Sequence, residues 1–245
     1  MKVAVIGAGN LGLSLIRNAS RKAEVVAVRR RKELIPEMRN VSAASEIEEA
    51  RNCDVFLITL KPDVFREKMR EIGEISEGKP VISFAAGVKM EEMRKFIESP
   101  FRAMTNPAIE SRTLVAVHPP SASEHLKFLD ADFIFCETEK ELDAMTSFIG
   151  SSPAVISRLI HAFIVSALHE GVSYRNAFKA ALSAFEASSY LFSRYSLNEI
   201  VEKMATPGGT TVEGLLEIIE AERSFAEALI QMSRKAKMLS SRERP

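Results

Sequence analysis

Residues 2–12 of the chain read Lys-Val-Ala-Val-Ile-Gly-Ala-Gly-Asn-Leu-Gly, a short apolar run followed by a glycine-rich turn. The glycines fit the spacing G-x-G-x-x-G, and a helical pattern continues to Arg21. This order of strand, turn and helix is typical of a site that binds the pyrophosphate of a dinucleotide at the helix N-terminus. The first glycine permits the tight turn, the second admits the pyrophosphate, and the third lets the helix pack on the strand. The predicted cofactor-binding residues of the turn are Gly7, Gly9, Asn10, Leu11 and Gly12.

Strand-like and helical patterns alternate from this turn as far as residue 150. The alternation predicts an α/β fold with a doubly wound parallel sheet. Ser45 and Thr138 each begin a sequence of capping-box form, so we expect a helix to begin after each of them. The expected strands are 2–6, 24–28, 54–60, 80–85, 101–104, 113–117 and 132–136, and the longer expected helices are 10–21, 64–72, 90–97 and 138–149.

The pattern changes at residues 150–153, Gly-Ser-Ser-Pro, after which every periodic segment is helical. We therefore expect a dinucleotide-binding domain over 1–150 and an all-α domain over 151–245. The later helices are apolar around most of their circumference, and about 95 residues cannot bury so much apolar surface alone. This predicts a homodimer formed through the helical domain, with a higher oligomer possible. The expected helices are 154–170, 175–192, 197–205, which a capping box at Ser196 opens, and 211–239.

The composition argues against several classes of partner. The 33 basic and 33 acidic residues give a formal net charge of zero, so we expect no nucleic-acid partner. Cys53 and Cys136 lie in apolar runs and are expected to be buried free thiols, which suits a cytoplasmic protein. The cysteines and histidines show no metal-site spacing, so no metal is expected. The apolar segment 155–168 is too short for a membrane span, so we expect a buried core helix and no membrane partner.

The second expected strand runs into Arg29, Arg30 and Arg31. A site for NAD usually has a carboxylate here that binds the ribose 2′-hydroxyl, and none is available. Guanidinium groups suit a 2′-phosphate through bidentate hydrogen bonds. The run therefore predicts NADP as the cofactor, in the form of NADPH, with Arg29 and Arg30 as contacts. NAD stays an alternative, as does a solvated loop without a ligand.

Two later strand ends are further cofactor candidates. Lys61 and Pro62 follow the third expected strand, and Ala85-Ala86-Gly87 ends the next one. Cofactor-facing loops leave a doubly wound sheet at the carboxyl ends of its strands. Small residues at the second place would let a nicotinamide ribose lie against the backbone. Either segment could also be an ordinary turn after a strand.

The chain's only adjacent pair of glycines lies in the stretch 206–211, Thr-Pro-Gly-Gly-Thr-Thr. A helical pattern follows at once, so the free N–H groups of a helix N-terminus could hold a substrate carboxylate. Thr210 and Glu213 have capping-box spacing, which would leave the Thr211 hydroxyl free for a substrate. A helix–helix turn without a ligand is the alternative. The predicted substrate-binding residues are Pro207, Gly208, Gly209, Thr210 and Thr211.

The sequence lacks the residues that several common reaction types require. The chain has no G-x-S-x-G elbow, and the helical half offers no clear lysine for acid–base work on a hydroxy acid. Reduction of a C=N bond needs less proton help than reduction of a C=O bond, because an iminium is already activated. A threonine hydroxyl is too weak an acid to drive the reaction, but it can orient an imine. Thr211 is therefore the predicted catalytic residue.

Six motifs together resemble the pyrroline-5-carboxylate reductase family over essentially the whole chain. They are the turn 7–12, Lys61-Pro62, and the segments 83–88, 102–107, 150–154 and 206–211. The resemblance implies NAD(P)H-dependent reduction of 1-pyrroline-5-carboxylate, a cyclic imine carboxylate, to L-proline. It also implies a Rossmann domain followed by a dimerising helical domain. By the same resemblance Thr211 contacts the ring nitrogen, the two glycines and the helix start hold the carboxylate, and Asn106 faces the cofactor.

The chain departs from the family pattern at three places. The motif at 104–107 is one residue short, 150–154 reads Gly-Ser-Ser-Pro-Ala, and 193–196 replaces an acidic or His-Pro segment. Two alternatives therefore stay open. One is a related imine or keto-acid reductase with another substrate, and the other is a nucleotide-sensing protein without turnover.

Overall fold

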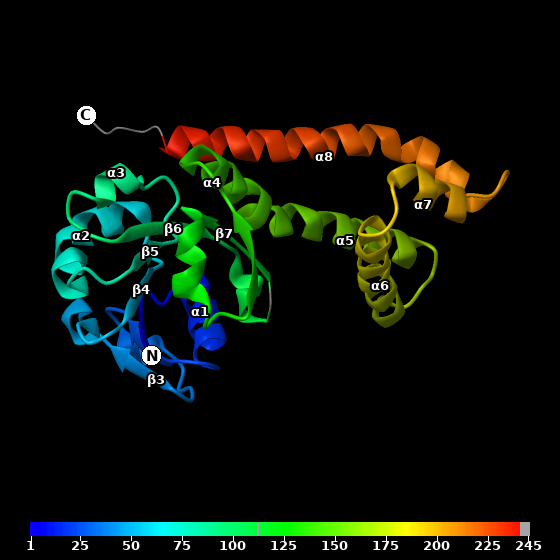
Figure 1. The fold of residues 1–245 in the computed structure, drawn as a ribbon. Coiled ribbons are helices and arrows are strands. Elements are labelled where there is room, and N and C mark those ends of the chain that lie inside the picture. The colour runs from blue at the N-terminus through cyan, green and yellow to red at the C-terminus, as the bar shows by residue number, and fades with distance from the viewer. Residues whose placement is uncertain (112, 241–245) are drawn as a thin grey trace. The chain divides into compact units, whose positions relative to one another are not determined.

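The computed structural model describes residues 1–111 and 113–240 of the chain (Figure 1). It divides into two compact units. One comprises Met1–Ser151 together with the segment that begins at Met232, and the other comprises Ser152–Gln231. Each unit is described by itself below.

The first unit is built on one mostly parallel sheet of eight strands, in the order β3-β2-β1-β4-β5-β6-β7-β8. All expected strands are present, and every neighbouring pair is parallel except β6 and β7. The predicted α/β fold is therefore confirmed. The strands are β1 (Lys2–Ile6), β2 (Glu24–Val28), β3 (Val41–Ala44), β4 (Val55–Ile58), β5 (Val81–Ser83), β6 (Pro100–Met104), β7 (Thr113–His118) and β8 (Ala131–Phe135).

Two features of the sheet differ from the expectation. The edge strand β3 was not expected, because its sequence Val-Ser-Ala-Ala has little apolar alternation. The pairing of β6 with β7 is antiparallel, whereas a wholly parallel sheet was expected. A parallel return needs a crossover of about a dozen residues. Only the short helix η3 (Pro107–Glu110) fits between these strands, so the chain has to turn back.

Helices cover the two faces of the sheet. On β1, Val3 and Val5 pack in one apolar cluster with Leu15 of α1, while Ala4 and Ile6 pack in a second cluster with Phe65 of α2. This alternation along a strand that is buried on both faces explains its continuous apolar sequence. The helices of this unit are α1 (Asn10–Ala19), α2 (Pro62–Ser76), α3 (Met90–Met93) and α4 (Glu139–Met145), with short 3-10 turns η1 (Lys32–Leu34), η2 (Ile47–Ala50), η3 and η4 (Pro120–Leu126).

The two capping predictions in this unit have different outcomes. Thr138 caps α4, because its Oγ1 accepts a hydrogen bond of 3.2 Å from the Glu141 N–H. Ser45 does not cap its segment. The Glu49 carboxylate instead accepts hydrogen bonds from the N–H groups of Ser45 and Glu46, so the short helix begins at Ile47.

Both cysteines are free and buried, as predicted. Burial raises the pKa of each thiol, Cys53 and Cys136, to about 11. The thiolate is the reactive form, so neither residue is a nucleophile at neutral pH.

A buried group of charges joins the sheet to α4. The Arg102 side chain on β6 is 1% exposed and forms ion pairs of 2.8 Å with both Glu139 and Asp143. Lys89, just before α3, donates a hydrogen bond to Asp143 as well. Glu139 also accepts a hydrogen bond of 3.0 Å from the Met90 N–H. Each carboxylate thus accepts hydrogen bonds from more than one donor. A buried ion needs such partners to offset the loss of its hydration.

The second unit is helical throughout, as expected. Ser196 caps α7 through a capping box with Glu199, which confirms that prediction. Gly150 and Pro153 do not interrupt the chain with a loop, because the π-helical segment η5 (Thr146–Ser151) joins α4 to α5. The helices are α5 (Ser152–His169), α6 (Tyr174–Phe192), α7 (Leu197–Met204) and α8 (Thr210–Ser240), of which the part from Met232 belongs to the first unit.

The expectation of a short, buried core helix at 155–168 is wrong. The helical stretch Glu139–His169 has 31 residues, and only 11% of its most apolar window is buried within the chain. By length and composition it could cross a membrane, the one helix among the described residues that could. The same composition is also found in helices that pack against another protein surface.

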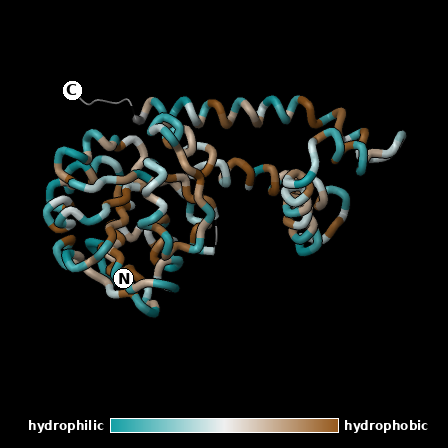
Figure 2. The backbone as a smooth tube through the Cα atoms, in the orientation of Figure 1, coloured by the Kyte–Doolittle hydropathy of each residue, from teal (hydrophilic) through white to brown (hydrophobic). Residues whose placement is uncertain are grey.

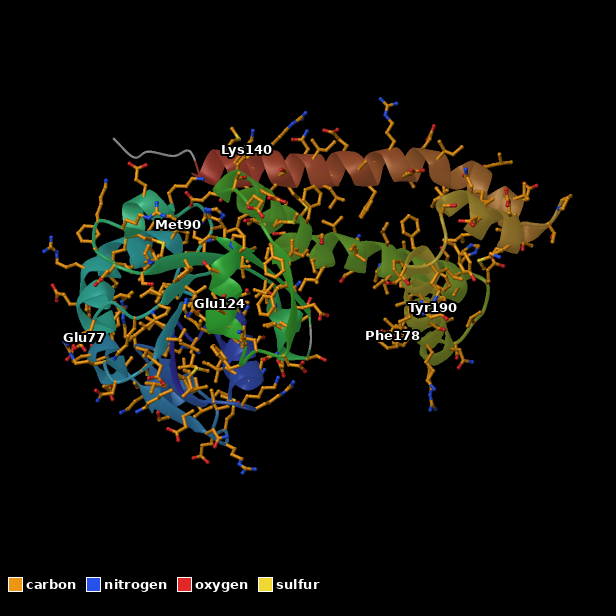
Figure 3. The ribbon with its side chains drawn as sticks, viewed as in Figure 1. Glu77, Met90, Glu124, Lys140, Phe178 and Tyr190 are labelled. Atoms are coloured by element: carbon orange, nitrogen blue, oxygen red, sulfur yellow. The ribbon has the colours of Figure 1, made fainter. Side chains whose placement is uncertain are left out.

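The apolar faces of the second unit lie largely at its surface. Its own buried cluster is small and centres on Ile164, Ala177 and Ala181. Hydrophobic stretches run along α5 and α8 in Figure 2, and Phe178 and Tyr190 project from α6 in Figure 3. Large exposed apolar patches usually mark an interaction surface. The exposed apolar residues include Leu159, Phe163, Val165, Leu168, Leu182, Phe192, Leu216, Ile218, Ile219 and Ile230.

We expect Asp143→Asn to lower the free energy of unfolding by about 3 kcal/mol, because it removes a charge that compensates the buried Arg102 guanidinium. Urea denaturation measures the change. Glu110→Gln is the control, because it breaks an exposed ion pair with Arg17. The Glu110 side chain is 47% exposed and the Arg17 side chain 40%. Its effect should stay below about 1 kcal/mol. Equal losses in the two variants would contradict the role given to the buried group.

Candidate functional site

A cavity of about 410 Å³ opens at the carboxyl ends of β1, β2, β3 and β4. We call it the strand-end cavity. The chain crosses from β1 to β2 on one side and β4 lies on the other, so this is the point where the strand order reverses. Ligands of doubly wound sheets bind at such a point. Its lining residues are Ile6, Gly7, Ala8, Gly9, Val28, Arg29, Arg30, Ser45, Glu46, Ile47, Thr59, Leu60, Lys61, Val64, Lys68 and Glu71.

The glycine-rich turn forms one wall of this cavity. Gly7 has φ of +109°, and a Cβ on Gly12 would lie 2.2 Å from the Gly7 carbonyl oxygen. Side chains are therefore excluded at both positions, as the motif predicts. A Cβ on Gly9 would meet no atom within 4 Å. The space beside Gly9 is open to the cavity, which is what close approach of a pyrophosphate requires.

Thr59 fixes the turn from the neighbouring strand end. Its hydroxyl lies 2.6 Å from the Gly7 carbonyl oxygen and donates a hydrogen bond to it. The first turn of α1 carries no acidic residue, so no carboxylate competes for the N-terminus of that helix. A dinucleotide pyrophosphate fits a helix end of this kind.

The charge of the cavity is mixed but predominantly positive. Arg29 and Arg30 line it from the end of β2, and Lys61 lines it just before the start of α2. Lys68 adds a fourth cation, while Glu46 and Glu71 contribute carboxylates. The donor set fits an anionic cofactor with an additional phosphate on its ribose. No group of three or more His, Cys, Asp or Glu residues among those described could hold a metal ion.

The other predicted cofactor residues do not line this cavity. Asn10, Leu11 and Gly12 belong to α1 behind the turn, and Pro62 is the first residue of α2. Ala85, Ala86 and Gly87 follow β5, where the Gly87 carbonyl accepts a hydrogen bond of 2.9 Å from Arg66. Their contact with a cofactor stays a prediction.

Asn106 is bound within the protein. Its Oδ1 accepts a hydrogen bond of 2.8 Å from the Ala108 N–H, and its Nδ2 donates one of 2.9 Å to the Ile149 carbonyl. The side chain caps η3 and ties the loop after β6 to η5. The structure thus gives the residue a positioning role, and a direct contact with the cofactor stays a prediction.

Sequence reasoning missed five polar residues of the cavity, of which Thr59 directly follows β4. Ser45 and Glu46 follow β3, so they could be placed only once that strand was recognised. Lys68 and Glu71 lie in α2, among several other charged residues of that helix. The signal that could have found them is their spacing of four and seven residues from Val64, which puts all three on one helix face.

The stretch 206–211 forms a tight bend between α7 and α8, as expected. Gly208 has φ of +71°, in the left-handed region that favours glycine. The Gly209 N–H donates a hydrogen bond of 2.8 Å to the Thr206 carbonyl. A Cβ on Gly209 would lie 2.5 Å from Thr206 Oγ1, so a side chain there would force a shift, whereas one on Gly208 would meet no atom but would strain the backbone. We call this bend the glycine elbow.

The capping prediction for Thr210 is wrong. The helix α8 begins at Thr210, because the preceding carbonyl of Gly209 already accepts a bond of 3.2 Å from the Val212 N–H. In the described part of the chain no hydrogen bond joins Thr210 to Glu213. The two glycines let the backbone enter the helix one residue early. The Thr210 side chain is exposed, whereas the Thr211 hydroxyl donates to the Met204 carbonyl at 3.3 Å.

Comparison with known proteins assigns both parts of the chain. Residues 139–241 match the family model for pyrroline-5-carboxylate reductase dimerisation, and residues 2–87 match the model for NADP oxidoreductase, coenzyme F420-dependent. A pyrroline-5-carboxylate reductase of Aquifex aeolicus is 28% identical, over 98% of this chain and 97% of that protein. The chain belongs to the pyrroline-5-carboxylate reductase family. A relative of the same name from Thermus thermophilus is 26% identical, over 99% of this chain and 100% of that protein.

Solved structures of this family share the fold. A Plasmodium falciparum pyrroline carboxylate reductase with NADP bound has a TM-score of 0.84 at 18% identity, over 98% of both chains. A 1-pyrroline-5-carboxylate reductase of Streptococcus pyogenes has a TM-score of 0.84 at 22% identity, over 97% of this chain and 98% of that one. The predicted order of an α/β domain and a helical dimerisation region is confirmed. The strand-end cavity lies wholly within residues 2–87, the NADP oxidoreductase match.

We expect Gly9→Ala to weaken NADPH binding at least tenfold, on the order of 1.4 kcal/mol, because its methyl group occupies the space beside the turn. The melting temperature should stay within about 2 °C of the wild type, because the added Cβ meets no neighbour. Nucleotide titration and thermal melting measure the two effects.

Gly12→Ala is the matched variant, because it adds the same methyl group where the Gly7 carbonyl lies 2.2 Å away. It should lower the melting temperature as well as the affinity. If Gly9→Ala binds NADPH as the wild type does, the cavity beside Gly9 is not the pyrophosphate site.

Proposed function

We propose that this member of the family reduces 1-pyrroline-5-carboxylate to L-proline with NADPH. The observation that carries the proposal is the occurrence in one chain of a strand-end cavity shaped for a dinucleotide and a glycine elbow that begins a helix. The names of the full-length relatives at 25–28% identity support the same reaction.

The strand-end cavity would hold the cofactor. The N-terminus of α1 and the open space beside Gly9 would take the pyrophosphate, and Arg29 and Arg30 would take the 2′-phosphate. Bound NADPH supplies the hydride that ends on the carbon of the C=N bond. The lack of a carboxylate directly after β2 favours NADPH over NADH.

The glycine elbow would hold the substrate carboxylate. The first N–H groups of a helix have no partner within it, and in α8 these belong to the residues that follow Gly209. A carboxylate at this end also interacts favourably with the helix dipole. The two glycines keep side chains away from the approach to these donors. Pro207, Gly208, Gly209 and Thr210 would therefore bind the substrate mainly through backbone.

Thr211 would orient the ring nitrogen. Its hydroxyl proton points to the Met204 carbonyl at 3.3 Å, so the lone pairs of the oxygen are left to accept a hydrogen bond. A protonated cyclic imine carries an N–H that can donate one. The electron pair of the C=N bond then passes to a nitrogen that already holds its proton, and no strong acid is needed. This fits an elbow whose side chains, over 206–211, include no acid or base.

A related imine or keto-acid reductase is the second candidate. The observation in its favour is the altered 104–107 motif, where the Asn106 amide is bound to protein at both polar atoms. A third candidate is a nucleotide-sensing protein without turnover, which the absence of an acid or base in the elbow would allow. Turnover of pyrroline-5-carboxylate, compared with a six-membered imine acid and a keto acid, separates the three.

We further propose that the helical region forms a homodimer, possibly part of a larger ring. The exposed apolar faces of α5, α6 and α8 lie within the dimerisation match at 139–241. A cytoplasmic location is proposed from the two buried free thiols and the balanced charge.

We expect Thr211→Val to lower kcat/KM about 100-fold, because it removes the hydrogen bond to the ring nitrogen without changing the size of the side chain. Steady-state NADPH oxidation with pyrroline-5-carboxylate measures the change. NADPH affinity should be unaltered, and Thr211→Ser should keep most of the activity because it keeps the hydroxyl. Full activity in the Val variant would rule out the role given to Thr211.

Self-association gives a separate prediction. The wild type should have a mass in solution of at least two 27.1 kDa chains. Leu216 and Ile219 of α8 are each 63% exposed, and glutamates at both positions should shift the mass toward a single chain. Light scattering after gel filtration measures it. Leu34→Glu changes an exposed leucine outside 139–241 and should leave the mass unaltered. A monomeric wild type would refute the dimer.

A further inference from the structure

One face of α2 forms a wall of the strand-end cavity. Val64, Lys68 and Glu71 line the cavity at positions i, i+4 and i+7, which lie on the same side of a helix. The adjoining side, with Phe65 and Met69, packs in the apolar core under the sheet. The core contacts therefore fix the rotation of the helix and direct Lys68 to the cavity.

Lys68 forms an ion pair with a carboxylate on its own helix and lines the same cavity as Arg30 at the end of β2. Its Nζ lies 2.8 Å from Glu71 Oε2. The hydrogen bond to Glu71 raises the pKa of Lys68, while the positive charge of Arg30 acts in the opposite direction. Lys68 and Arg30 thus line one cavity with charges of the same sign, although they belong to different elements.

We propose that Lys68 determines the preference of this protein for a 2′-phosphate by binding that group from α2, opposite Arg30 at the end of β2. The inference rests on the proposed cofactor and assigns it a residue beyond the arginine run. A phosphate dianion placed between the two walls would meet a guanidinium fork on one side and an ammonium on the other.

Glu71 explains how Lys68 remains at the cavity before a phosphate arrives. The ion pair is on the surface, with side chains 47% and 38% exposed, so it contributes little stability and a phosphate can compete for the ammonium. Of the carboxylates in the cavity, Glu46 lies on the β3 side and its charge reaches Lys68 more weakly than that of Glu71. An adenosine without the 2′-phosphate offers Lys68 no anion at this place.

Calorimetric binding of adenosine 2′,5′-bisphosphate and adenosine 5′-monophosphate to the full chain tests the proposal. Both probes lack the nicotinamide, so the result is independent of whether the protein reduces pyrroline-5-carboxylate. The wild type should bind the bisphosphate more tightly. Lys68→Met should weaken bisphosphate binding about tenfold and change monophosphate binding less than about twofold.

Arg70→Met is the matched control, because it removes one positive charge from the same helix. Arg70 stacks on Phe96 at 5.4 Å and is not part of the cavity lining. It should leave the ratio of the two affinities unaltered. The proposal is overturned if the wild type does not prefer the bisphosphate, if Lys68→Met keeps the ratio, or if Arg70→Met lowers it equally. Monophosphate binding shows in each case that the variant is folded.

Discussion

The close approach of two backbone segments at the N-terminus governs the first unit. Gly12 at the start of α1 lies against the Gly7 carbonyl, and Thr59 from the adjacent strand donates a hydrogen bond to that same oxygen. The helix, the turn and β4 are thereby fixed to one another at a point where no side chain fits. The direction of the α1 N-terminus follows from this contact, while the pairing of β2 with β1 places the arginines beside the turn at the same cavity.

Much of the fold could be predicted from the sequence, because its strands are apolar on both faces and its helices carry clear periodicity. The edge strand β3 was not predicted, because its small residues show no alternation of apolar and polar side chains. The antiparallel return into β7 could have been read from the eight residues that separate it from β6, too few for a crossover. The order of helices in the second unit was clear, but how far their faces are exposed is visible only in the structure.

The candidate site was predictable in its motifs and not in its details. Gly7, Gly12 and Gly209 lie where other atoms approach closely, Gly208 has a left-handed backbone, and Gly9 borders open space, so each glycine has a conformational or spatial reason. Whether Thr210 or Thr211 forms a hydrogen bond within the elbow depends on where the helix begins. The spacing predicted a start at 211, one residue later than the observed start at Thr210. Residues such as Lys68 belong to the cavity only through the packing of the buried face of their helix.

The two buried thiols give the chain a practical property. With pKa values of about 11, only on the order of 10⁻⁴ of each is ionised at pH 7, and both side chains are shielded from solvent. Alkylating reagents and disulfide-forming probes will therefore leave them largely untouched in the folded state. A single cysteine introduced at the surface can therefore carry a fluorophore or spin label while Cys53 and Cys136 stay in place and unlabelled.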